Sequence, residues 1–373
     1  MEFRKRTLEN LVKMKDQLIN TYSGKKVFLT GHTGFKGAWL VKILHLLGAE
    51  VKGYALAPQT EYDLYNLING DKLCYSIIDD LRDRNKLVNE ISDFKPDYVF
   101  HLAAQPLVRL SYSIPSETFE VNAIGTANLL DGIRNLDQKC NVVLITTDKV
   151  YHNNEWVYPY RETDRLGGYD PYSASKACAE LVIDSYKNSF FNFTDYNSHK
   201  KLISVARAGN VIGGGDWSEN RLLPDIAKSL IKGNKVLVRN PKSIRPWQHV
   251  LEPLFGYLLL GLKMSNESKQ LHGAYNFGPY NEDVLSVDQM VKLAIQYWGN
   301  GDFENVEQQN QLHEAGILKL DISKAESELG WKPKMDAKKA VELTIEWYRA
   351  FNIEKSTISK FTEVQISNYL NLL

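Results

Sequence analysis

Two short segments carry the side chains that could do chemistry. Thr146-Thr147-Asp148-Lys149 places hydroxyls, a carboxylate and an ammonium directly after the apolar run 142–145. Tyr172 and Lys176 stand four residues apart, so a helix would present both on one face. There a lysine ammonium can lower the pKa of a tyrosine hydroxyl and make it a base near neutral pH. Because Tyr-x-x-x-Lys also occurs by chance in many helices, the pattern is evidence for a catalytic pair only if the rest of the chain supports it.

A glycine-rich turn earlier in the chain is of the kind that holds a dinucleotide. Residues 26–30 read as a strand, glycines follow at positions 31, 34 and 37, and an apolar helical pattern continues to residue 47. Such glycines let the backbone approach a pyrophosphate, which then binds at the helix amino terminus. The alternative is an ordinary strand-to-helix turn. No acidic residue or arginine ends the second strand at 51–56, so that position does not decide between NAD and NADP.

Composition and charge restrict the class of protein. The 373 residues suit one large α/β domain with a smaller companion. The 45 basic and 45 acidic residues balance, which gives no argument for a nucleic-acid or membrane partner. The charged amino terminus has no signal-peptide pattern, and no apolar run approaches the ~20 residues that span a bilayer. Three scattered cysteines predict buried reduced thiols and hence a cytoplasmic location. The eight histidines lack metal-ligand spacing, so no metal site is expected.

Strand and helix patterns alternate from residue 25 to residue 207, which predicts a parallel sheet. The expected strands are 26–30, 50–55, 74–78, 97–102, 142–146 and 202–207. The expected helices are 34–47, 83–94, 115–135 and 171–190, with an added amphipathic helix at 1–24.

Beyond residue 207 the periodicity loosens, and glycine, proline and tryptophan cluster. We expect an α/β fold: a Rossmann-type doubly wound parallel sheet with a smaller mixed α/β carboxyl-terminal domain for the substrate. The dinucleotide-binding domain would comprise 1–207 and 245–270, because 247–264 reads as a strand and helix returning to it. The smaller domain would comprise 208–244 and 271–373.

Longer runs resemble the extended short-chain dehydrogenase/reductase family, in its branch of sugar-nucleotide dehydratases. The most specific runs are Thr30–Gly37, His101–Tyr112, Gly167–Ser173, Arg207–Trp217 and Ser243–Val250. The tail segments 318–324 and 329–333 resemble the carboxyl-terminal signature of extended members. The resemblance runs from about residue 24 to about residue 347 and is closest to the members that act on CDP-glucose. It implies NAD that is held tightly and used with no net redox change.

The resemblance also implies the roles of the chemical residues. Tyr172 would take the proton of the sugar 4-hydroxyl, Thr147 would hydrogen-bond the reacting oxygen, and Asp148 would protonate the departing 6-hydroxyl. Lys176 would contact the nicotinamide ribose and tune the tyrosine. Lys149 stands where the dTDP-glucose dehydratases carry the Glu taken as the C5 base, and a lysine can act as a base only in its neutral form. The alternatives are an ion pair with the preceding aspartate, or a water as the base.

Cofactor and substrate contacts follow from the same resemblance. The expected cofactor contacts are Gly31, His32, Thr33, Gly34, Phe35, Lys36, Gly37, Asp80, Leu81, Ala103, Ala104, Gln105, Asn122, Thr146, Tyr172 and Lys176. The expected substrate contacts are Arg109, Asn210, Arg221, Arg245 and His313, since guanidinium groups suit phosphate oxygens. Asp80 matches an adenine-contacting aspartate, but its composition alone would equally suit a helix cap. Asn122 is expected mainly to steady the active-site strand.

Other functions of the same fold remain as alternatives. A dehydratase acting on GDP-mannose or dTDP-glucose would share the chemistry, whereas an epimerase needs no elimination acid such as Asp148. A non-catalytic NAD sensor would be free to lose Tyr172 or Lys176. The expected partners are the nucleotide sugar, CDP-glucose by resemblance, and a second copy of the chain. In the family, helices matching 115–135 and 171–190 pair across a two-fold axis, which predicts a homodimer and leaves a tetramer open.

Overall fold

A parallel sheet forms the centre of the computed structural model, which describes residues 14–266, 271–306 and 317–373. Its strands are β1 (Lys26–Thr30), β2 (Glu50–Ala55), β3 (Tyr75–Ile78), β4 (Tyr98–His101), β5 (Cys140–Thr147), β6 (Lys201–Ala208) and β11 (Ala274–Phe277). They lie in the order β11-β6-β5-β4-β1-β2-β3, with every neighbouring pair parallel. The strand order reverses between β1 and β4, and open α/β sheets bind ligands at the carboxyl ends of strands at such a point.

This sheet confirms the predicted Rossmann-type α/β class. All six expected strands are present, each with ends within two residues of the predicted ones. The seventh strand, β11, was not predicted from the sequence. It pairs with β6, although its residues fall in the range assigned to the smaller domain.

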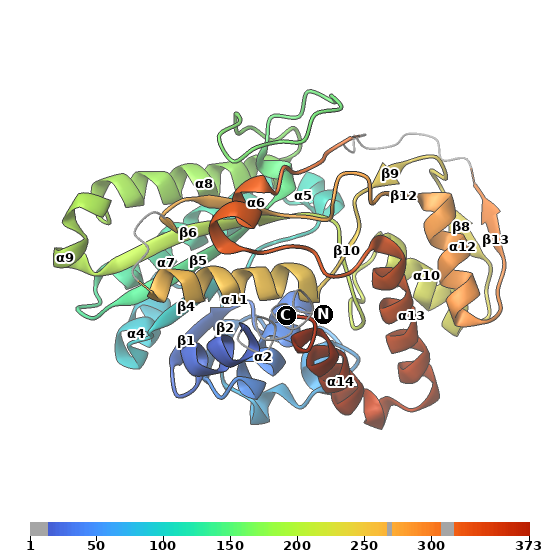
Figure 1. Ribbon diagram of the computed structural model, residues 1–373, viewed down its shortest axis with the longest axis horizontal. Helices are drawn as coiled ribbons and strands as arrows, with labels where there is room; N and C mark the ends of the chain where they lie inside the picture. Colours follow the sequence, from blue (N-terminus) through green and yellow to red (C-terminus); the bar gives the residue numbers. More distant parts are fainter. Residues whose placement is uncertain (1–13, 267–270, 307–316) are drawn as a thin grey trace, which may run out of the picture.

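Helices cover both faces of the sheet (Figure 1). They are α2 (Phe35–Leu46), α3 (Leu64–Leu67), α4 (Arg84–Phe94), α5 (Val108–Ser113), α6 (Pro115–Phe119), α7 (Gly125–Arg134), α8 (Pro171–Ser189), α9 (Tyr196–His199), α10 (Leu222–Ile231), α11 (Leu251–Ser265), α12 (Val287–Trp298), α13 (Ala337–Ile353) and α14 (Ile358–Leu370). Two π-helical turns are η2 (Glu120–Ile124) and η6 (Ala325–Leu329), and single 3₁₀ turns are η1 (Gly70–Lys72), η3 (Asp148–Val150), η4 (Phe193–Asp195) and η7 (Lys355–Thr357).

The side chains of the sheet alternate between two cores. In β1, Val27 and Leu29 belong to one core, whereas Phe28 belongs to the other. The first core includes apolar residues of α2 and α11, and the second includes those of α4, α7 and α8. Figure 1 shows α8 and α11 on opposite sides of the sheet. Burial on both faces explains why the central strands read as nearly continuous apolar runs.

A smaller group of elements lies to the right of the sheet in Figure 1. It contains α10, α12 and α13 around a core of their own. Its short strands are β7 (Val211–Ile212), β8 (Val236–Val238), β9 (Ile244–Arg245), β10 (Gln248–His249), β12 (Leu285–Ser286) and β13 (Phe303–Asn305). β10 pairs with β7 and β13 with β8 in parallel, whereas β12 and β9 are antiparallel.

The carboxyl-terminal segment is anchored to the elements that cover the sheet. The buried carboxylate of Glu252 in α11 accepts hydrogen bonds from the backbone N–H groups of Lys334 and Met335, at 2.9 and 2.8 Å. It also accepts one from the hydroxyl of Tyr369 in α14, at 2.7 Å. The range 271–373 therefore contains elements that contact both parts of the molecule, and the division of the chain into two domains stays a proposal.

The amino-terminal helix is described in part. Residues 14–22 are helical, and Leu18 and Tyr22 are buried in the first core. The Tyr22 hydroxyl donates to the carbonyl of Leu258 in α11, at 2.7 Å. Residues 1–13 of the predicted helix lie outside the described residues. In the part of the chain that is described, no helix combines the length and apolar character needed to cross a membrane. The three cysteines are free.

Candidate active site

The glycine-rich turn joins β1 to α2 where the strand order reverses. Gly31 has a φ of +76°, and a Cβ there would lie 2.7 Å from the backbone nitrogen of Ala103. A Cβ at Gly37 would lie 1.9 Å from the carbonyl oxygen of Gly31. In the described structure no side chain caps the amino end of α2 at Gly34, so its first N–H groups are available to an anion. This shape and donor set fit the pyrophosphate of a dinucleotide.

Two side chains of this turn, the buried His32 and the half-buried Lys36, lie where burial opposes their charge. Burial lowers the pKa of His32 to about 4, so the ring is neutral near pH 7. Burial, with the positive charges of Lys176 and Arg221, lowers the pKa of Lys36 to about 7, whereas Asp148 opposes this shift. Three cationic side chains from α2, α8 and the start of α10 therefore act on one another here. Their mutual repulsion favours an anionic ligand.

Two further residues of the turn make packing contacts. The Thr33 hydroxyl donates to the carbonyl of Leu56 after β2, at 2.7 Å. The ring of Phe35 lies against the backbone of Gly213, because a Cβ added at that glycine would be 3.1 Å from the ring. Their expected contacts with the cofactor stay predictions.

Asp80 follows β3 and does not cap a helix. Its carboxylate accepts hydrogen bonds from the guanidinium of Arg82, at 2.7 Å, and from the backbone N–H of that residue, at 2.8 Å. These bonds lower the pKa of Asp80. The cap of α4 is Asp83, whose carboxylate accepts from the N–H of Lys86. The helix-cap alternative is therefore wrong, and the contact of Asp80 with adenine stays a prediction. Leu81 is buried in the second core.

The segment after β4 is held by one asparagine. Ala103 and Ala104 are half-buried there. Asn122, in the π-helical turn η2, accepts from the backbone N–H of Gln105 at 2.8 Å and donates to its carbonyl at 3.1 Å. Its amide also donates to the Ser175 hydroxyl on α8, at 2.8 Å. Asn122 thus has a supporting role of the predicted kind, but it supports the loop after β4 and the helix α8 rather than a strand.

The chemical residues at the end of β5 contact those of α8. The Thr147 hydroxyl donates to the carboxylate of Asp148 at 2.9 Å. The side chains of Thr147 and Tyr172 interact as well, since Thr147 opposes the rise that burial causes in the pKa of Tyr172. All three side chains are buried, and Lys149 is half-buried in η3. The fold therefore brings together a carboxyl and a phenol from two segments that the sequence singled out separately.

Tyr172 and Lys176 are buried on α8, and their surroundings shift the pKa of both side chains. Burial raises the pKa of Tyr172 to about 12, and the positive charge of Arg221 opposes this. The Lys176 ammonium donates to a backbone carbonyl of β5 at 3.0 Å. Burial lowers its pKa to about 8, and the negative charge of Glu180 opposes this. Arg221 therefore supplies a positive charge that acts on the tyrosine, and the tuning of Tyr172 by Lys176 stays a prediction.

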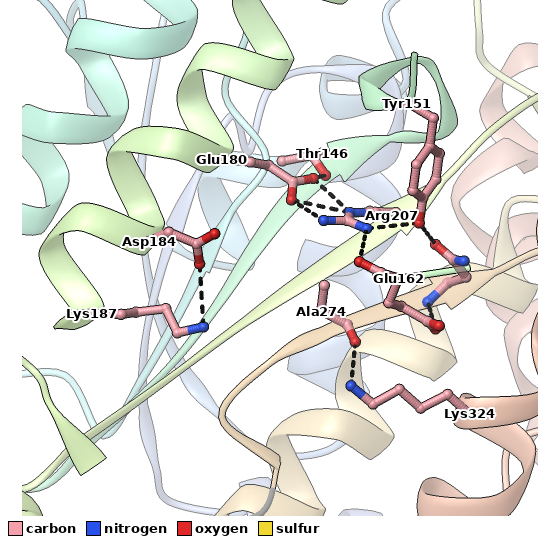
Figure 2. Close-up of polar contacts among 10 residues, drawn as sticks. Thr146, Tyr151, Glu162, Glu180, Asp184, Lys187, Arg207, Ala274 and Lys324 are labelled. Atoms are coloured by element: carbon pink, nitrogen blue, oxygen red, sulfur yellow. Dashed lines mark hydrogen bonds and ion pairs between the residues drawn. The ribbon is translucent and has the colours of Figure 1, made fainter. Parts of the chain in front are cut away.

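A buried ion pair ties α8 to the sheet one helical turn after Lys176. Figure 2 shows the guanidinium of Arg207 on β6 paired with the carboxylate of Glu180, both side chains being less than 5% exposed. Thr146 on β5 donates to the same carboxylate at 2.6 Å. Arg207 also donates to the Tyr151 hydroxyl at 2.7 Å and to a backbone carbonyl at 3.0 Å. Thr146, expected at the cofactor, thus has its hydroxyl engaged in this network.

Of the expected substrate residues, Arg221 acts electrostatically on Tyr172. It precedes α10, and its guanidinium donates to the carboxylate of Asp216 at 2.9 Å. Because its positive charge acts on Tyr172, this side chain connects the start of α10 electrostatically to α8.

The other expected substrate residues come from separate segments. Asn210 follows β6 with a φ of +46°, Arg245 is in β9, and Arg109 in α5 donates to Asn220 at 3.4 Å. Their contacts with a substrate stay predictions. His313 lies outside the described residues. Among the residues described, no group of three or more His, Cys, Asp and Glu side chains is arranged to hold a metal ion.

Sequence reasoning missed Glu180 as a functional residue, although a signal was present. Glu180 follows Lys176 by four residues, as Lys176 follows Tyr172, so the three share one face of α8. Arg207 carried no local signal, because its pairing depends on how β6 packs against this helix.

Comparison with known proteins shows the family of this chain. Residues 28–344 match the family described as GDP-mannose 4,6 dehydratase. The chain therefore belongs to this family, within the extended short-chain dehydrogenases/reductases.

Individual relatives are similar over nearly the whole chain. The CDP-glucose 4,6-dehydratase of Salmonella typhimurium (strain LT2) is 46% identical over 352 residues, which cover 94% of this chain and 98% of that protein. The UDP-glucose 4-epimerase of Thermotoga maritima, solved with UDP-glucose, has a TM-score of 0.75 at 23% identity and covers 88% of this chain and 100% of that chain. The dTDP-glucose 4,6-dehydratase of Streptomyces venezuelae, solved with NAD and TYD bound, has a TM-score of 0.73 at 24% identity, with coverage of 87% and 97%. At these identities the two solved structures support the fold alone.

The Glu180 carboxylate should set the pH range in which Lys176 is charged. The lysine is charged below its pKa of about 8 and loses its charge as the pH rises through that value. The pKa values of Lys36 on α2 and His101 on β4 are lowered by burial, and the positive charge of Lys176 lowers both further. We expect Glu180→Gln to shift the alkaline limb of the rate of cofactor reduction to lower pH. Stopped-flow absorbance at a series of pH values measures this limb.

A matched control lies one turn along α8. Asp184 pairs with Lys187 at 3.5 Å and is 60% exposed, so Asp184→Asn should leave the alkaline limb in place (Figure 2). Glu180→Gln should also lower the free energy of unfolding by about 3–5 kcal/mol, because it leaves the Arg207 charge buried without its partner. An alkaline limb that does not move in a folded Glu180→Gln protein would contradict the electrostatic role.

Proposed function

We propose that this protein is a CDP-glucose 4,6-dehydratase, which converts CDP-D-glucose to CDP-4-dehydro-6-deoxy-D-glucose and water. The observation that carries the proposal is the 46% identity to the Salmonella CDP-glucose enzyme over nearly the full length of both chains. Thr147, which is hydrogen-bonded to Asp148, and the neighbouring Tyr172 supply side chains suited to this reaction.

NAD is the cofactor, and it supplies the acceptor of the C4 hydride and later the donor of a hydride to C6. The uncapped amino end of α2 and the glycines at 31 and 37 fit its pyrophosphate. The half-buried Ala103 and Ala104 give it room on the neighbouring strand end. Lys36 and Lys176 add positive charge beside the turn.

The side chains of this chain then move the protons. Tyr172, as phenolate, takes the proton of the 4-hydroxyl while Thr147 hydrogen-bonds the same oxygen. The 4-keto group makes the C5–H acidic, and neutral Lys149 takes that proton. Asp148 protonates the 6-hydroxyl, the C6–O bond breaks, and water leaves as the C5–C6 double bond forms. A hydride then adds to C6 and Lys149 returns its proton to C5, which completes the 4-keto-6-deoxy sugar.

The cations around Tyr172 favour a substrate with phosphate groups. Arg221 is held by Asp216 beside the tyrosine, and its guanidinium suits a diphosphate oxygen. A diphosphate would offset the repulsion among Arg221, Lys36 and Lys176. We therefore assign the nucleotide diphosphate to Arg221, with Asn210 and Arg245 as further contacts.

Turnover of defined sugar nucleotides tests the function. Purified protein with NAD would be incubated separately with CDP-, dTDP-, GDP- and UDP-glucose and with GDP-mannose, and followed by proton NMR. We expect a new C6 methyl doublet and loss of the C5 proton with CDP-glucose alone. A methyl signal with another donor in its place would contradict the assigned nucleotide. A change at C4 without a methyl signal would indicate an epimerase.

Two substitutions should separate the stages of the reaction. Tyr172→Phe removes the base for the first oxidation, so neither reduced cofactor nor product should form. Asp148→Asn keeps that base but removes the acid, so reduced cofactor should accumulate at 340 nm while product formation slows by about 10²–10⁴-fold. Product formation by Asp148→Asn at the wild-type rate would show that the acid assignment is wrong.

We also propose a homodimer in which α7 and α8 meet the same helices of a second copy. Ile124 before α7 and Leu181 on α8 are 55% and 60% exposed, which suits an apolar face covered by a partner. A tetramer formed from two such dimers is compatible with this face. The three free cysteines support the expected cytoplasmic location.

A charge on this face should weaken the dimer. We expect Leu181→Glu to shift the mass measured by sedimentation toward the monomer, because the carboxylate would be buried between the two copies. Ile353→Glu is the control, since Ile353 is an apolar residue of α13 that is 81% exposed. An unchanged mass for Leu181→Glu would remove α8 from the interface.

A further inference from the structure

The pairing of β5 with β6 places two residues side by side just beyond the ladder. The last two register pairs are Thr146 with Arg207 and Thr147 with Ala208. Asp148 and Gly209 are the next residues of the two strands. The first of these pairs contributes two members of the buried network of Figure 2, so the network ties both strand ends to α8.

The carboxylate of Asp148 lies directly against the backbone of Gly209. A Cβ at position 209 would stand 2.0 Å from Oδ2 of Asp148, 2.2 Å from Cγ and 2.6 Å from Oδ1. Distances below 3.0 Å are essentially never seen for real Cβ atoms. The backbone at Gly209 does not adopt a positive φ, so its conformation is open to other residues. Glycine is therefore required at this position because a side chain would not fit, and not because of the backbone conformation.

The backbone at this position is held in place. The side-chain amide of Gln248 on β10 donates to the carbonyl of Gly209 at 3.1 Å and to that of Phe277 at 2.9 Å. The backbone N–H of Gln248 donates to the carbonyl of Asn210 at 3.2 Å. Because three bonds from one residue tie the segment to β10 and β11, an added side chain would displace the aspartate more readily than the backbone.

We infer that Gly209 is a positioning residue for the elimination step: its missing side chain creates the space in which the Asp148 carboxylate lies while it accepts the Thr147 hydrogen bond. This inference rests on the proposed role of Asp148 as the acid that protonates the leaving 6-hydroxyl. Tyr172 and Lys176, which serve the first oxidation, lie on α8. The three atoms nearest to a Cβ at position 209 all belong to Asp148 and none to these two residues.

A methyl group at position 209 should therefore affect one stage of the reaction. To reach 3.0 Å from the new Cβ, Oδ2 of Asp148 must move by at least 1.0 Å from its present 2.0 Å. Asp148 and Gly209 border a cavity of about 10 Å³, so the carboxylate has space to move into and the protein can keep its fold. A displacement of about 1 Å in a catalytic group costs on the order of 10²-fold in rate.

The test compares three single variants with the wild type. Gly209→Ala and Asp148→Asn would be mixed with NAD and CDP-glucose, with absorbance at 340 nm reporting the oxidation and NMR of the C6 methyl reporting elimination. Gly278→Ala is the matched control, because a Cβ there would meet Leu320 at an ordinary 3.6 Å. We expect Gly209→Ala to reduce the cofactor at nearly the wild-type rate, to form product about 10²-fold more slowly, and to melt within a few degrees of the wild type. Gly278→Ala should behave as the wild type in both assays.

The double variant Gly209→Ala/Asp148→Asn distinguishes positioning from general damage. If Gly209 acts through Asp148, the double variant should form product no more slowly than Asp148→Asn alone. Multiplied losses, or equal losses of oxidation and elimination in Gly209→Ala, would overturn the inference. If Gly209→Ala eliminates water at the wild-type rate while Asp148→Asn is slow, the inference about Gly209 is wrong but the role of Asp148 as the acid stands. Normal turnover by Asp148→Asn would instead remove the acid assignment, and the inference with it.

Discussion

The active site depends on the buried pair of Glu180 and Arg207. Removing two charges from water costs several kcal/mol per ion, so such a pair is tolerated when its remaining hydrogen-bonding groups are satisfied. Here the hydroxyls of Thr146 and Tyr151 satisfy them from two sides. The pair connects α8 to β5 and β6, so one interaction orients the helix that carries Tyr172 and the strand end that Asp148 follows.

The same helix also brings positive charge into a buried place. Lys176 on α8 lies near enough to Lys36 and Arg221 that their charges lower the pKa of Lys36. Glu180 offsets part of this charge from the next turn, and Asp148 offsets part from β5. A nucleotide phosphate supplies the remaining negative charge when a ligand binds. The repulsion among the cations is thus a physical reason why this fold binds anionic molecules at the ends of its strands.

The sequence predicted the elements that carry a strong periodic pattern. The six expected strands alternate with helical patterns and turn residues along the chain, and the helix that holds Tyr172 is 19 residues long, so local patterning was sufficient. β11 escaped prediction because its four residues follow a long helix and reach the sheet only through pairing with β6. Asp80 shows the same limit at the scale of one residue: its composition equally suited a helix cap, whereas the folded chain pairs it with Arg82 and caps α4 with Asp83.

The sequence by itself determined which chemical groups are available and that Tyr172 and Lys176 share a helical face, because the period of a helix is a local property. It also placed the glycines of the cofactor turn, whose spacing is local as well. Only the tertiary structure decided the partners of these groups: a β5 carbonyl for Lys176, the charge of Arg221 for the tyrosine, and the bare backbone of Gly209 for the acid. The physical reason is that these contacts join residues far apart in the chain, and their distances depend on strand register and on helix-to-sheet packing, which no local pattern specifies.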